Sequence, residues 1–93
     1  MYASFNRFEI QMTKAQADSA SHAGQCDSDV AYLVADRRIQ RQLAKIGTDA
    51  IREELKEYGA WDADELADDT QNQHRIVWCA ACNIHEEAAQ KRA

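Results

Sequence analysis

The sequence predicts an all-α fold: a small single-domain bundle of four to five helices around a long C-terminal helix, with a short extended N-terminal segment. Two features of the composition favour it. The 93 residues include no proline and only three glycines, too few turn residues for a barrel or sandwich of many short strands. Hydrophobic residues make up 45% and charged residues 29%, a mixture typical of a globular domain. At this length we expect one domain over residues 1–93.

The beginning of the chain has a two-residue period. In residues 5–12, FNRFEIQM, apolar and polar side chains alternate from Phe8 to Met12, which favours an extended segment over the alternative of an early helix. Thr13 and Gln16 then have the spacing of a capping box, in which each side chain bonds a main-chain amide of the other residue. This box predicts a short helix that ends before Gly24.

The next helical stretch runs up to Gly47. Asp27 and Ser28 can cap its start. Its apolar stripe changes register near Asp36, where we expect a kink. Gly47 is expected to end the stretch in the left-handed conformation.

A helix over residues 48–58 is expected next, capped by Thr48 or Asp49 and stopped by Gly59. Its buried face is predicted to carry Ile51, Leu55 and Tyr58.

The last helix is predicted over residues 63–88. Asp62 and Glu65 have the Asx-x-x-Glu spacing of a helix start. Residues 76–82, IVWCAAC, are apolar on all sides, and such a helix segment is usually central and buried. The other helices are therefore expected to pack around it.

Cysteine and histidine residues raise the possibility of a zinc-stabilised protein, because zinc prefers these ligands. Cys79, Cys82 and His85 follow one another at three-residue spacing, and Cys26 lies elsewhere. One helix cannot point all three at one ion, since Cys79 and His85 are roughly 240° apart around its axis. We therefore interpret them as core residues and expect no metal and no cofactor.

Residues 37–58 have the outline of a helix–turn–helix. The first half carries a cationic stripe made of Arg37, Arg38, Arg41 and Lys45. The would-be recognition helix carries three glutamates, and carboxylates repel phosphates. A small DNA-binding regulator is therefore only an alternative. The net charge of −5 also argues against uniform binding to a nucleic-acid backbone.

Acidic residues crowd the segment from Asp49 to Asp69. Nine carboxylates face only Arg52 and Lys56 there, a net charge of −7, whereas residues 36–46 have a net charge of +3. An acidic lobe of this kind favours encounter with a basic partner surface. Trp61 could pack on the core or serve as an exposed anchor. The expected partner-binding residues are Glu53, Glu54, Glu57, Trp61, Asp62, Asp64, Glu65, Asp68 and Asp69.

Other function classes find little support in the sequence. It contains no phosphate-binding glycine loop, no GxSxG elbow and no HExxH, so we expect no enzyme. No apolar run approaches the roughly 18 residues of a membrane span, and residues 1–10 lack the features of a signal peptide. An odd count of three cysteines agrees with a reducing compartment. These features predict an intracellular, cytoplasmic protein.

Two stretches, ASHAGQCDSDV at residues 20–30 and EELKEYGAWDADELADDTQNQHRIVWCAACNI at residues 53–84, resemble a group of short proteins encoded by bacteriophages and prophages. The segment EYGAWD is the most specific part. The resemblance carries over no functional residues. Together with the small size and acidity, it implies a host-defence inhibitor of the anti-CRISPR type, with a basic host protein or ribonucleoprotein as partner. A homodimer is a further alternative, if residues 5–12 pair across two chains.

Overall fold

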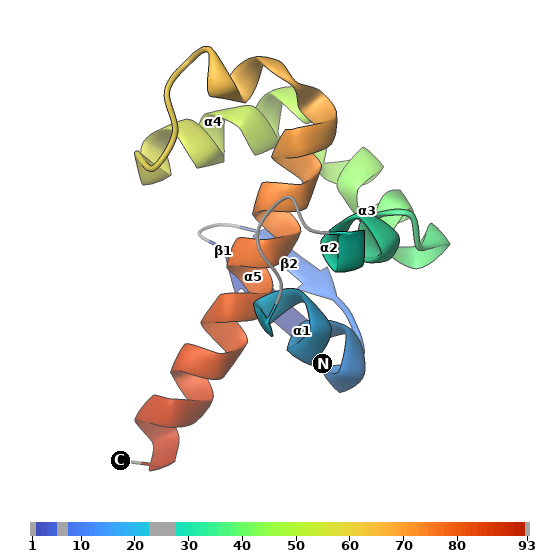
Figure 1. The fold of residues 1–93 in the computed structure, drawn as a ribbon, viewed down its shortest axis with the longest axis vertical. Helices are drawn as coiled ribbons and strands as arrows, with labels where there is room; N and C mark the ends of the chain where they lie inside the picture. Colours follow the sequence, from blue (N-terminus) through green and yellow to red (C-terminus); the bar gives the residue numbers. More distant parts are fainter. Residues whose placement is uncertain (1, 6–7, 23–27, 93) are drawn as a thin grey trace.

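A β-hairpin followed by helices makes up the protein (Figure 1). The computed structural model describes residues 2–5, 8–22 and 28–92, with side chains described over 8–20 and 30–83. The elements are β1 (Tyr2–Phe5), β2 (Phe8–Gln11), α1 (Lys14–His22), α2 (Ser28–Val34), α3 (Arg37–Ile46), α4 (Thr48–Tyr58), the 3-10 turn η1 (Glu65–Ala67) and α5 (Asp69–Arg92). The predicted all-α domain with a long C-terminal helix is confirmed.

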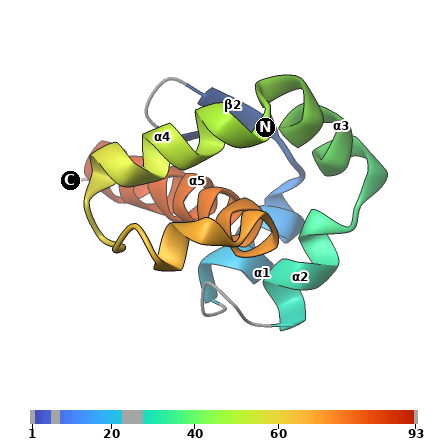
Figure 2. The same cartoon turned by 90° about the horizontal axis from the view of Figure 1, so that it is seen from above.

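The central element is α5. It contacts β1, α1, α2 and α4, and Figure 1 shows it running the length of the molecule. Seen from above in Figure 2, α4 lies along one side of it and α1 and α2 lie on another. The prediction that residues 76–82 are central and buried is confirmed, although Trp78 and Cys82 are only partly buried. Alanines are buried on both α1 and α5, at Ala17, Ala20, Ala80 and Ala81, which permits close approach of these two helices.

The predicted extended segment is confirmed as strand β2. It pairs with β1 in the antiparallel sense, in a register that places Tyr2 opposite Gln11 and Phe5 opposite Phe8. Its Ile10 side chain is fully buried in the core. On the other side of Gln11, the Gln42 amide of α3 accepts a hydrogen bond from the Gln11 N–H and donates one from Nε2 to the Gln11 carbonyl oxygen at 2.9 Å.

Two helix starts follow directly from local sequence. The predicted capping box is confirmed: the Thr13 N–H donates to Gln16 Oε1 at 2.9 Å and the Gln16 N–H donates to Thr13 Oγ1 at 3.1 Å. The expected kink near Asp36 is a full break between α2 and α3. Asp36 Oδ1 accepts hydrogen bonds from the main-chain N–H groups of Arg38, at 2.9 Å, and Ile39, at 3.2 Å, and so starts α3.

The expectation for Gly47 was wrong in its details. Its φ of 91° is positive, but its ψ of 148° places it outside the left-handed helical region. Gly47 ends α3 and also precedes α4 directly, so Thr48 is already helical and neither Thr48 nor Asp49 is the cap. The cap position of α4 is Gly47 itself, which has no side chain to accept a hydrogen bond from the first turn. Gly59, by contrast, ends α4 as predicted, and it does so in the left-handed conformation, at φ 81° and ψ 10°.

The last helix begins at Asp69, not at residue 63. The start predicted at Asp62 and Glu65 yields only the 3-10 turn η1, because Asp68 is extended and interrupts the helix. Asp68 Oδ1 then accepts hydrogen bonds from the N–H groups of Thr70, at 2.9 Å, and Gln71, at 3.2 Å. None of the helices in the described ranges combines the length and apolar character that a membrane crossing requires.

The cap at Asp36 gives a first prediction. Replacing Asp36→Ala removes the acceptor for two amides of α3 and should lower the free energy of unfolding by about 1 kcal/mol. Urea denaturation followed by circular dichroism measures the change. Asp36→Asn keeps the acceptor oxygen and should stay close to the wild-type value; equal losses in both variants would contradict the capping role.

Candidate protein-docking surface

Five exposed carboxylates lie within residues 62–69, which we call the acidic turn. No lysine or arginine occurs in these eight residues. The turn connects α4 to α5 and lies at one end of the molecule, away from the C-terminus of α5 (Figure 1). The structure thus brings together the following predicted partner-binding residues: Asp62, Asp64, Glu65, Asp68 and Asp69.

The acidic turn has a defined main-chain conformation. The Asp62 N–H donates to Glu65 Oε1 at 3.0 Å, and the Leu66 N–H donates to the Asp62 carbonyl oxygen at 3.1 Å. Asp68 uses one carboxylate oxygen to cap α5. Glu65 and Asp68 therefore shape the turn as well as adding to its charge.

A buried polar pair on α5 holds the turn from beneath. The Asn72 side chain donates from Nδ2 to the Leu66 carbonyl oxygen at 2.9 Å. Arg75, which is only 7% exposed, donates from Nη1 to the Glu65 carbonyl oxygen at 2.7 Å and to Asn72 Oδ1 at 3.2 Å. Leu66 itself is buried in the core. The main chain of the turn is thus fixed to the central helix at two consecutive carbonyl groups.

Trp61 contributes to this support. Its ring lies over the Arg75 guanidinium, with the Cζ atom 5.4 Å from the ring centroid, an arrangement that favours a cation–π interaction. The Tyr58 ring also packs against the Trp61 ring, with the ring centroids 5.9 Å apart and the ring planes tilted by 33°. Trp61 is partly buried, so of its two predicted roles the packing role accounts for the observed contacts.

The glutamates of α4 do not all belong to the surface. Glu53 and Glu57 are exposed, but Glu54 is only 1% exposed, so its expected contact with a partner was wrong. Glu54 lies on the same face as Ile51 and Leu55, because residues three apart on a helix share a face. Tyr58, which was predicted to lie on that buried face, is exposed instead and packs on Trp61.

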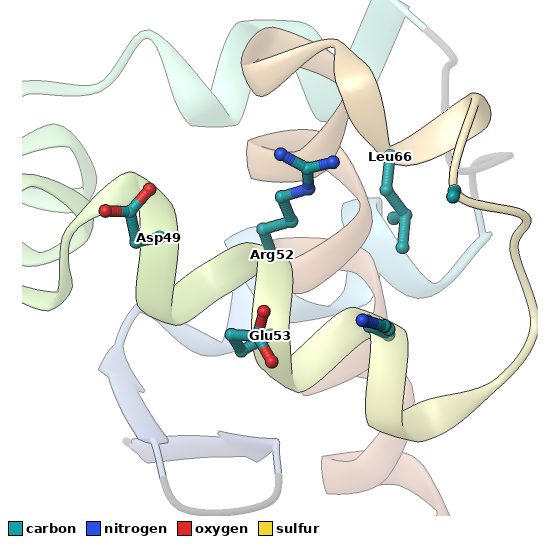
Figure 3. Close-up of a pocket in the computed structure, with 6 residues that line it drawn as sticks. Asp49, Arg52, Glu53 and Leu66 are labelled. Atoms are coloured by element: carbon teal, nitrogen blue, oxygen red, sulfur yellow. The ribbon is translucent and has the colours of Figure 1, made fainter.

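A shallow hollow of about 180 Å³ separates α4 from the acidic turn (Figure 3). Figure 3 shows Arg52 extending from α4 into the space beside Leu66. Charges of both signs line the hollow, from Asp49, Arg52, Glu53 and Lys56. Arg52 and Lys56 therefore offset much of the negative field of α4, and the centre of the acidic surface lies on the turn itself.

His74 lies on α5 next to these supporting residues. Its side chain is buried, and within the described part of the chain its Nδ1 atom has no hydrogen-bond partner. Burial lowers its pKa below the ordinary value of 6.5, while the nearby Asp68 carboxylate acts in the opposite direction. The folded protein therefore favours neutral His74.

The cysteines show the features of core residues. Burial raises the pKa of Cys79 to about 12, with a further contribution from Cys82, and burial also raises the pKa of Cys82. Thiols that stay protonated at neutral pH are poor metal ligands and poor nucleophiles. Among the described residues, no three histidine, cysteine or acidic side chains form a group that could hold a metal ion. Cys26 and the side chain of His85 lie outside the described residues.

The helix–turn–helix alternative can be compared with the geometry of α3 and α4. The four cations of the stripe are all exposed on α3. The helix in the recognition position, α4, exposes Glu53 and Glu57. Insertion of α4 into a DNA groove would place these carboxylates close to phosphates, which is unfavourable.

A second prediction concerns the anchor of the turn. Replacing Arg75→Met keeps most of the apolar stem but leaves the Glu65 carbonyl oxygen and Asn72 Oδ1 without their donor. The free energy of unfolding should fall by about 1–3 kcal/mol, and the amides of residues 62–68 should exchange with solvent faster. Hydrogen exchange read by mass spectrometry checks this. The exposed Arg52→Met is the matched control, and wild-type exchange in Arg75→Met would disprove the anchor.

A third prediction concerns the pH dependence of stability. Because folding lowers the His74 pKa, the unfolded chain takes up the proton first as the pH falls. Neutral His74 therefore contributes fully to the free energy of unfolding above pH 6.5. This contribution is lost as the pH falls from 6.5 through the lowered pKa of the folded state. Below pH 6.5 the free energy of unfolding of the wild type should therefore fall relative to that of His74→Leu. A difference that stays constant with pH would contradict this.

Comparisons with known proteins gave no further guide: no family model matched the chain, and neither did any curated protein or any solved structure.

Proposed function

We propose that the protein is a phage-encoded inhibitor of a host defence nucleoprotein complex, of the anti-CRISPR kind. It would act by docking the acidic turn on a basic groove that otherwise holds nucleic acid. The resemblance of residues 20–30 and 53–84 to short phage and prophage proteins supports the origin. The acidic turn supports the mode of action.

The proposal rests on the concentration of negative charge in the acidic turn, whose main chain is fixed to α5 by hydrogen bonds. Five carboxylates in eight residues are exposed at one end of a molecule that measures 38 × 27 × 23 Å. The nearest buried cation, Arg75, gives its Nη1 hydrogen bonds to a main-chain carbonyl and an amide oxygen, not to these carboxylates. The five carboxylates are thus exposed to solvent and are not hydrogen-bonded to Arg75 Nη1.

Docking through the acidic turn favours fast and specific association with a partner of opposite charge. Opposite fields steer two molecules toward each other over about a Debye length, which is roughly 8 Å at physiological salt. A turn that is already ordered loses little conformational entropy on binding, because the hydrogen bonds to α5 fix it beforehand. Tyr58, exposed beside Trp61, adds an aromatic side chain at the edge of the surface.

The test uses a panel of purified CRISPR effector ribonucleoproteins, with capture of a labelled DNA target as the readout. The wild-type protein should block capture by at least one of them. A triple variant, Asp62→Asn with Asp64→Asn and Asp69→Asn, removes three charges but leaves Glu65 and Asp68 to shape the turn. It should inhibit about tenfold less, as expected for losing three exposed charge contacts.

The matched control raises the net charge by the same three units elsewhere, with Ala15→Lys, Ser19→Lys and Tyr32→Lys, all at exposed positions. It should inhibit nearly as well as the wild type. Equal loss in both variants would mean that only the total charge matters. Full inhibition by the Asn variant, or no inhibition of any complex in the panel, would rule the proposal out.

A further inference from the structure

The helix α3 carries a second charged surface that the proposed function does not use. Its cationic stripe consists of Arg37, Arg38, Arg41 and Lys45, and all four side chains are exposed. The opposite face buries Ile39 and Leu43 in the core. At 100° per residue, the four cations fall within roughly 100° of the helix circumference, so they form one face.

We propose that this stripe binds the phosphodiester backbone of a nucleic acid. The inference does not depend on the proposed function. The contact would be made by the exposed face of α3 lying along the backbone, without insertion of α4 into a groove. It therefore differs from a helix–turn–helix and does not bring the α4 glutamates into a groove.

The spacing of the charges fits a phosphate array. Arg37, Arg41 and Lys45 are on successive turns, about 6 Å apart along the axis, and Arg38 lies beside them. Four charges over about 12 Å give one charge per roughly 3–4 Å, similar to the roughly 3.4 Å per phosphate along one DNA strand. Three of the four are arginines, whose forked donors suit phosphate oxygens.

The surroundings of the stripe favour a phosphate backbone over an acidic protein. Protein interfaces usually centre on buried aromatic anchors. The large exposed hydrophobic residues in the described part of the chain are Tyr32 and Tyr58, and neither lies on α3. No acidic residue occurs within α3, and the one at its start, Asp36, is engaged in the cap.

The net charge of −5 does not prevent such a contact. At physiological salt a charge is screened beyond roughly 8 Å, so the groups nearest the phosphates determine the local interaction. One exposed carboxylate does lie close by: Glu9 lines the hollow of about 430 Å³ that also includes Gln42, Lys45 and Ile46. Glu9→Gln should therefore strengthen binding.

The experiment measures anisotropy of a labelled 20-base-pair duplex DNA and of a labelled single-stranded RNA, between 20 and 200 mM salt. Four phosphate contacts predict a slope of log affinity against log salt of up to about −3.6, so a fourfold rise in salt should weaken duplex binding by up to about 150-fold. Arg38→Gln with Arg41→Gln should reduce the magnitude of the slope by about 1.8. The exposed residue Lys14→Gln, on α1, is the control and should leave the slope unchanged.

Each outcome decides the question. Arg38→Lys with Arg41→Lys keeps the charges and should keep most of the binding, and circular dichroism confirms that every variant is folded. No binding of either nucleic acid at 20 mM salt would overturn the proposal, and so would equal slopes for the wild type and the glutamine variant. A poly-glutamate peptide with the same net charge as the labelled nucleic acid serves as a further competitor. If this peptide binds more tightly than the nucleic acids, the proposal is overturned in favour of an acidic protein partner.

Discussion

A single buried guanidinium, that of Arg75, joins the central helix to the acidic turn. It donates to the Glu65 carbonyl oxygen, contacts Asn72 one turn earlier on its own helix and lies against the Trp61 ring, so it ties the connection between α4 and α5 to α5. A buried cation is costly unless its donors are used. Arg75 Nη1 has two acceptors, whereas the buried Nε atom has no hydrogen-bond partner among the described residues. The Nη1 hydrogen bonds go to a main-chain oxygen and an amide oxygen, so they do not occupy the exposed carboxylates of the turn.

The distribution of charge gives the molecule two distinct faces. The acidic turn lies between α4 and α5, whereas the cations gather on the exposed face of α3. Between them, α4 carries both signs, with Arg52 and Lys56 close to Asp49 and Glu53 in one hollow. A host nucleoprotein complex also presents both signs, as basic protein and as phosphate. The two proposed surfaces are therefore compatible with one target, although each is tested separately.

Features set by neighbours in the sequence could be predicted, and those set by distant contacts could not. The capping box at Thr13, the break at Asp36 and the left-handed Gly59 depend on residues within four positions, so their sequence patterns were sufficient. The burial of Glu54 and the late start of α5 depend on packing between α4, the turn and α5. The acidic site was predicted as a segment, but its support was missed. The available signal was Asn72 and Arg75, two polar residues near the start of α5 and ahead of its apolar segment 76–82, whose partners are 6 and 10 residues away.

The side chain of Gln42 has a consequence for solubility. A two-stranded hairpin has outer edges whose main-chain groups can recruit strands from other molecules, which leads to fibrils or exchanged hairpins. The Gln42 amide presents the same donor and acceptor as a peptide group, and it occupies both main-chain groups of Gln11. At that point an incoming strand would have to displace a partner held on a packed helix. Gln42 thereby hinders the addition of a strand from another molecule at the end of β2, although it adds no third strand itself.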